Sequence, residues 1–187
     1  MDGMILQELR QTREALLHPA SGLVWLLAMV MVVLERPVAE AMPACMLAAL
    51  LVVLAVVDVK THTLPNLLNA AVLLLGVMVA DIWWQALLAA VAAYAVFQLV
   101  ALGSRALLRK EGMGQGDVKL FAALGAWVGL MGLPLVALVG SVLALAYILA
   151  VRHPRGARLP FGPFLAAGGW LVFLYQYEMW AWLGLRM

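Results

Sequence analysis

The stretch that decides the fold runs from Ala41 to Asp58 and is AMPACMLAALLVVLAVVD. It holds no charge before its terminal aspartate and approaches the length of about 20 residues that a helix needs to cross a bilayer. The whole chain is similarly apolar: 66% of its 187 residues are hydrophobic, 12% are charged, and the mean hydropathy is +1.02. Soluble domains are only about 45–50% apolar and about 25% charged. Composition therefore excludes a soluble fold, and it excludes disorder as well.

Apolar runs of this kind recur along the chain and predict an all-α polytopic membrane bundle of about seven transmembrane helices. The run 118–151 is interrupted before Pro134 and is too long for one crossing, so we expect two spans there. Gly125 and Gly129, four residues apart, predict a surface for close helix packing. The predicted spans are 21–34, 41–57, 67–79, 86–104, 118–131, 134–151 and 161–177.

The distribution of charge predicts the orientation. With seven spans and a cytoplasmic N-terminus, the inner segments hold all 12 lysines and arginines except Arg36 and Arg186, as the positive-inside rule requires. Residues 1–19 are the most polar and space their apolar side chains along one helical face, which predicts a short interfacial helix. Residues 20–187 then form the membrane domain. A net charge of +2 is too small to indicate a nucleic-acid partner.

Two polar segments, Asp58–Asn66 and Gly112–Lys119, interrupt the apolar pattern on the predicted inner side. Each places an aspartate, Asp58 or Asp117, at the membrane boundary, where a carboxylate is costly and marks a functional site. Paired carboxyls hydrolyse peptide bonds when one activates water and the other donates a proton. Helix ends favour an anion at the N-terminus and disfavour one at the C-terminus. We therefore expect Asp117 to be the ionised base and Asp58 the protonated acid.

Residues around the two aspartates are candidates for substrate binding or support. The glycines at 112, 114 and 116 permit positive φ angles and close backbone approach, and Pro65 fixes a turn after the first aspartate. Lys60 and Lys119 each lie two residues after an aspartate. We expect them to tune the two carboxyl groups, to contact substrate or to anchor the inner face. The supporting candidates are Gly114, Gly116, Lys60, Lys119 and Pro65.

These segments resemble a known family. Asp58 followed by Leu64-Pro65-Asn66, and then Gly114-Gln115-Gly116-Asp117, are similar to the paired motifs of the type IV prepilin peptidases, which are intramembrane aspartic proteases. The likeness continues through 120–127 and 159–164 and covers roughly 41–177. It implies that Asp58 and Asp117 are catalytic. It also implies that the substrate is a type IV prepilin or pseudopilin, cleaved between its short basic leader and its hydrophobic helix.

The chain departs from the larger family members in one respect. Those members carry a cytoplasmic insertion with a four-cysteine zinc site and also methylate the new N-terminus. Here Cys45 is the one cysteine, and only 35–40 separate the first two predicted spans. This departure puts N-methyltransferase activity in doubt, and we expect neither a metal nor a cofactor.

The predicted function is therefore an aspartic endopeptidase of the bacterial inner membrane with its active site facing the cytoplasm, serving type IV pili or protein secretion. Its expected partners are the prepilin or pseudopilin substrate and the lipid bilayer, and the oligomeric state is open. The alternative is a small proton- or ion-coupled transporter that uses the same two carboxylates. The transporter hypothesis predicts acidic residues near mid-membrane and an internal repeat. The sequence shows neither feature. A third interpretation is a non-catalytic assembly scaffold.

Overall fold

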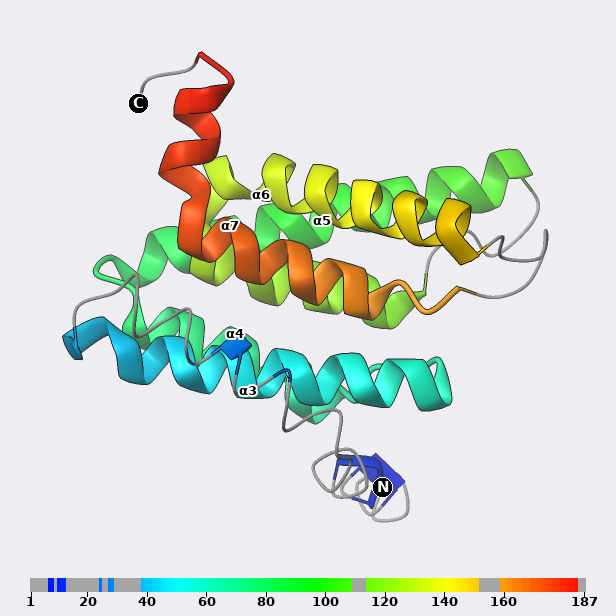
Figure 1. Ribbon diagram of the computed structural model, residues 1–187, viewed down its shortest axis with the longest axis horizontal. Helices are drawn as coiled ribbons and strands as arrows, with labels where there is room; N and C mark the ends of the chain where they lie inside the picture. Colours follow the sequence, from blue (N-terminus) through cyan, green and yellow to red (C-terminus); the bar gives the residue numbers. More distant parts are fainter. Residues whose placement is uncertain are drawn as a thin grey trace.

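The computed structural model describes residues 7–8, 10–12, 24, 27–28, 38–108, 114–151 and 159–184. These residues form helices joined by short connections, with no strand among them (Figure 1). The all-α prediction is confirmed for this part of the chain. Most of the predicted interfacial helix 1–19 and most of the predicted span 21–34 lie outside the described residues.

The long helices of the described region follow the predicted apolar runs. They are α3 (Val38–Thr61), α4 (Asn66–Val79), α5 (Trp83–Leu108), α6 (Gln115–Val151) and α7 (Gly162–Trp182). Three of them hold stretches long and apolar enough to cross a membrane, at Ala41–Thr61, Trp83–Ser104 and Gln115–Val151, and α4 is a shorter apolar helix. These lengths and compositions are those of a membrane protein.

The longest helix, α6, is broken at Gly129, where φ is 68° and ψ is 179°. Gly169 of α7 faces Leu124, which precedes the break, while its neighbour Gly168 faces Gly140, which follows the break. Both parts of α6 therefore flank the same turn of α7, and the chain folds back on itself at the break (Figure 1). This geometry agrees with the predicted division of 118–151 into two segments.

The pair Gly125 and Gly129 does not form the expected packing surface. A Cβ atom on Gly125 would lie 3.0 Å from the carbonyl oxygen of Ala89, so this glycine does allow α5 and α6 to approach closely. Gly129 has no neighbouring atom within 4 Å of a built Cβ. Its role is conformational instead, because only glycine adopts its backbone angles without strain.

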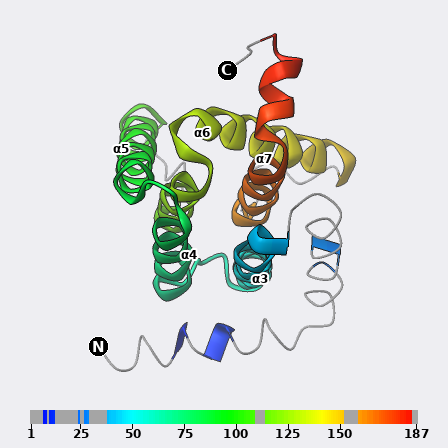
Figure 2. The same ribbon diagram turned by 90° about the vertical axis from the view of Figure 1, so that its left-hand side faces the viewer.

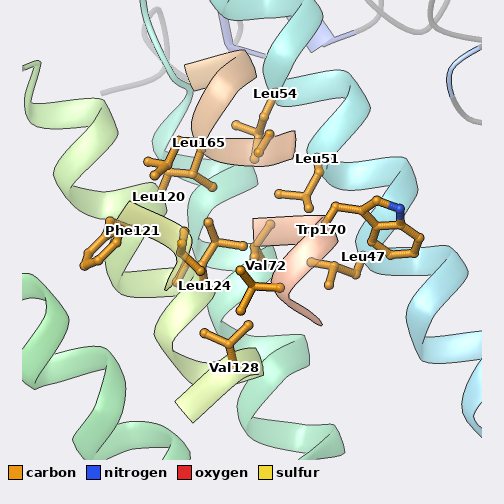
Figure 3. Packing of buried hydrophobic residues seen from close by; sticks show 14 of the residues in the cluster. Leu47, Leu51, Leu54, Val72, Leu120, Phe121, Leu124, Val128, Leu165 and Trp170 are labelled. Atoms are coloured by element: carbon orange, nitrogen blue, oxygen red, sulfur yellow. The ribbon is translucent and has the colours of Figure 1, made fainter. Parts of the chain in front are cut away.

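The first part of α6 lies at the centre of the bundle. Helix α6 contacts α4, α5 and α7, and α3 contacts α7 and α4 (Figure 2). The apolar core between them is shown in Figure 3, where Leu54 of α3, Leu120 of α6 and Leu165 of α7 meet. All three leucines are fully buried. This packing holds the end of α3 and the beginnings of α6 and α7 at one end of the bundle.

Candidate active site

Asp58 lies in the last turn of α3 and is only 5% exposed. Its Oδ2 atom accepts a hydrogen bond of 2.9 Å from the backbone N–H of Gly162. Its carbonyl oxygen accepts a second bond, of 2.8 Å, from the N–H of His62, which ends the helix with a φ of 52°. The Gly162 N–H gives the buried carboxyl group a hydrogen-bond partner, and burying this group unsatisfied would be costly.

Gly162 approaches Asp58 so closely that no side chain fits between them. A Cβ atom built on Gly162 would lie 2.7 Å from Oδ2 of Asp58 and 3.0 Å from its carboxyl carbon. Gly162 begins α7, and Pro163 follows within the first turn. The N-terminus of α7 therefore faces the carboxyl group, which is the favourable placement of an anion relative to a helix dipole.

Asp117 lies in the first turn of α6 and is half-buried. Its backbone N–H donates a 3.1 Å bond to the carbonyl oxygen of Gly114. Gly116, which precedes Asp117, packs against Leu64 of the loop that follows Asp58, since a Cβ on Gly116 would lie 2.8 Å from the Cβ of Leu64. Two aspartates that are 59 positions apart in the sequence thus share one end of the bundle. The backbone hydrogen bond of Asp117 does not identify which of the two aspartates is ionised. The assignment of Asp117 as the ionised base and Asp58 as the protonated acid stays a prediction.

The glycines before Asp117 serve close approach and not positive φ. Among the described residues, only Gly129, Gly184 and His62 have φ in the left-handed region. A Cβ on Gly116 would lie 2.8 Å from the Cβ of Leu64, and a Cβ on Gly114 would lie 3.2 Å from Oδ2 of Asp117. Gly114 and Gly116 therefore do not use positive φ, and they allow close packing within the chain; their role toward a substrate stays a prediction. Gly112 lies outside the described residues.

The loop that follows Asp58 is held by hydrogen bonds where it enters α4. Pro65 is buried, with extended φ and ψ of −60° and 131°, and it directly precedes the helix. The first N–H groups of α4, on Asn66 and Leu67, donate to the two carboxylate oxygens of Glu8 over 3.1 and 3.2 Å. The side chain of Lys119 donates to Oδ1 of Asn66. The Lys119 contact joins the Leu64-Pro65-Asn66 motif to α6.

The two lysines therefore have different surroundings. Lys119 contacts Asn66, and this contact supports the loop. Lys60 is exposed and lines an apolar cavity beside the site. Asn69, which the sequence interpretation missed, is 4% exposed, and its amide reaches the carbonyl oxygen of Gly116 at 3.5 Å. The described residues contain no group of three His, Cys, Asp or Glu side chains that could hold a metal ion.

Apolar helices that bring two acidic side chains together at one end define a helical membrane protein with a paired-carboxyl site. The sequence model of the type IV leader peptidase family matches residues 45–149, which contain both Asp58 and Asp117. This match covers more than half of the chain. The protein belongs to the type IV leader peptidase family.

Individual relatives agree with this assignment. The chain is 35% identical over 139 residues to a prepilin leader peptidase/N-methyltransferase of Neisseria gonorrhoeae, covering 72% of this chain and 49% of the relative. It is 38% identical over 145 residues to a protein of the same name from Xanthomonas campestris, covering 73% and 50%. It is 37% identical over 150 residues to the protein of that name from Aeromonas hydrophila, and the match covers 74% of this chain and 51% of the relative. The chain thus spans about half the length of these relatives. No solved structure matches it.

Proposed function

We propose that the protein is an aspartic endopeptidase that removes the leader from prepilins or pseudopilins, with Asp58 and Asp117 as its catalytic residues. The observation that carries this proposal is that the two acids lie at one end of the bundle, Asp58 5% exposed in the last turn of α3 and Asp117 half-buried in the first turn of α6, with Gly116 packed against Leu64 between them. The family assignment supports the same conclusion, and the matched region contains both residues.

The pair supplies what hydrolysis of a peptide bond requires. The ionised carboxylate takes a proton from water, the resulting hydroxide attacks the scissile carbonyl, and the protonated carboxyl stabilises the developing oxyanion. Proton transfer to the leaving amine then breaks the C–N bond. One product gains a carboxyl terminus and the other gains an amino terminus. Because the two groups share a proton, the protonation states belong to the pair.

We propose a cytoplasmic site in a seven-span protein of the bacterial inner membrane. The break at Gly129 supports counting two spans within α6. The excess of lysine and arginine in the segments that join these helices at the Asp58 end supports a cytoplasmic location. Water and an unwound leader reach such a site without a deep channel through the membrane.

The relatives' name joins two activities, and the proposal concerns the peptidase. The prepilin substrate comes from the names of those relatives. The cysteine-rich insertion expected of methylating members has no counterpart in this chain, whose one cysteine, Cys45, is part of α3.

The direct test is hydrolysis of a purified prepilin in water enriched in ¹⁸O, followed by mass spectrometry of the released leader. A peptidase places one labelled oxygen in the new carboxyl terminus of the leader. The Asp117→Ala variant, purified to the same level, controls for contaminating proteases. Absence of leader release by the parent protein in detergent and in vesicles would contradict the proposal and leave the transporter and scaffold interpretations.

A further inference from the structure

Asn69 is a buried polar residue beside the candidate site, and the proposed reaction does not use it. It lies one turn into α4, where its backbone N–H donates a 3.2 Å bond to the carbonyl oxygen of Pro65. Asn69 and Asp58 are the two polar or charged residues that are buried among the described residues, and Asn69 is 4% exposed. An apolar side chain would occupy such a position at lower cost, so the amide group requires an explanation.

Stability alone does not account for the Asn69 amide. Its nitrogen reaches the carbonyl oxygen of Gly116 at 3.5 Å, but its Oδ1 atom has no hydrogen-bond partner among the described residues. A buried acceptor without a donor is energetically costly. The carbonyl group of Gly116 belongs to the first turn of α6, where the helix itself supplies a donor. The contact from Asn69 is therefore not needed to satisfy the backbone of α6.

The contact falls on the peptide group that joins Gly116 to Asp117. The carbonyl oxygen of this group accepts from Asn69, and its N–H, which belongs to Asp117, donates a 3.1 Å bond to the carbonyl oxygen of Gly114. The two atoms lie in one rigid plane, so this plane is held at both of its polar atoms. A rotation of the plane would turn the backbone at Asp117 and redirect its side chain.

We propose that Asn69 is a positioning residue for Asp117, which it holds through the carbonyl group of Gly116. Asp117 is the third residue of α6, and helix ends fray. Helix α4 packs beside α6 (Figure 2), and the amide of Asn69 restrains the end of α6 that carries the carboxyl group. Asn69 itself contacts neither water nor substrate in this role. The inference rests on the proposed function and adds to it a residue that acts through the backbone.

The test replaces the amide by an apolar group of similar size. Asn69→Leu removes the donor to Gly116 together with the unsatisfied Oδ1 atom. Its matched control is Gln176→Leu, the same kind of change at a half-buried position of α7, fourteen residues beyond Gly162. With a prepilin as substrate, we expect Asn69→Leu to lower kcat by about tenfold or more with KM nearly unchanged, because a small displacement of a reacting group is costly in rate. Gln176→Leu should retain both parent values.

The melting temperature separates positioning from a purely structural role. Because Asn69→Leu removes an unsatisfied buried atom, we expect this variant to melt no lower than the parent protein. Asn69→Ala removes the same amide without adding a branched side chain, and it should show the same fall in kcat. Loss of the folded state in both variants, or a fall in kcat no larger than the fall in the folded fraction, would overturn the positioning role.

A second measurement follows the Asp117 carboxyl group without using activity. The chain has four aspartates, so ¹³C labelling of their carboxyl carbons gives four NMR resonances, and the resonance that Asp117→Asn removes belongs to Asp117. At one fixed pH, we expect Asn69→Leu to shift this resonance and to leave that of Asp81 in place. An unshifted Asp117 resonance, or a kcat equal to that of Gln176→Leu, would overturn the role of Asn69 and leave the peptidase assignment intact. Failure of the parent protein to cleave the prepilin would instead overturn the proposed function.

Discussion

The backbone N–H of Gly162 donates a 2.9 Å hydrogen bond to Oδ2 of Asp58, across 104 positions of the sequence. This bond joins the last turn of α3 to the first residue of α7. The carboxyl group lies so close to α7 that a Cβ on Gly162 would be 2.7 Å from its Oδ2 atom. The orientation of Asp58 is therefore set by a backbone group that a side-chain search of the sequence does not reveal.

Replacing Gly162 by alanine should impair activity more than folding. The added methyl group would contact the carboxyl group of Asp58, and displacement of a reacting group by about 1 Å costs about 10²-fold in rate. We expect kcat for leader removal to fall by about that factor, with KM changed much less. The measurement is steady-state kinetics on the purified variant.

The control for this substitution is Gly103→Ala, because a Cβ at Gly103 meets no atom within 4 Å. This variant should keep the activity of the parent protein. Equal kcat for Gly162→Ala and Gly103→Ala would show that the contact with Asp58 has no part in the reaction. Thermal unfolding of both variants separates a loss of activity from a loss of structure.

The glycines before Asp117 should differ in their tolerance of alanine. At Gly116 the new methyl group would lie 2.8 Å from the Cβ of Leu64, an atom fixed by the backbone. At Gly114 it would lie 3.2 Å from Oδ2 of Asp117, an atom at the end of a side chain that can move. We therefore expect Gly116→Ala to lower the melting temperature more than Gly114→Ala does. The reverse order of melting temperatures would contradict the described packing.

The break in α6 should depend on glycine at position 129. Its φ of 68° and ψ of 179° belong to a region that other residues enter at a cost of about 1–3 kcal/mol. Gly129→Ala should therefore lower the free energy of unfolding by that amount, although there is open space for the methyl group. Unfolding in detergent, compared with Gly103→Ala, measures the cost. Identical stabilities would show that α6 does not need this backbone geometry.

Lys119 should act through Asn66 and not through the carboxyl pair. Its side chain donates to Oδ1 of Asn66 at the start of α4, and contacts at the surface contribute about 0.5 kcal/mol or less. We expect Lys119→Met and Asn66→Ala to have small effects on stability, and the double variant to show no further loss. A large fall in activity for Lys119→Met alone, with none for Asn66→Ala, would indicate a direct role in substrate binding.

Periodicity and composition predicted the helices well, because lipid imposes long apolar runs that end at charged residues. The predicted runs 41–57 and 67–79 correspond to α3 and α4. The positions of the two aspartates at helix ends were also predictable from the ends of the apolar runs, and their catalytic role stays a proposal that rests on the cost of an acid at the membrane boundary. Neither inference depends on knowing how the helices pack.

Other features depend on tertiary structure and left little trace in the sequence. The role of Gly162 comes from the position of α7 beside α3, although a Gly-Pro pair before an apolar run marks a helix start. Glu8 reaches the start of α4 from a segment 58 positions away. Gly129 looked like a packing glycine because its spacing from Gly125 is helical, and spacing alone does not reveal a broken backbone.

The central claim is that Asp58 and Asp117 act together on one peptide bond. The most direct measurement is kcat for prepilin cleavage by purified Asp58→Asn and Asp117→Asn, with Asp81→Asn, an exposed aspartate outside the site, as the control. We predict that each of the first two variants loses at least about 10²–10⁴-fold in kcat while remaining folded, and that Asp81→Asn retains the parent rate. Near-parent cleavage by either Asp58→Asn or Asp117→Asn would contradict the account.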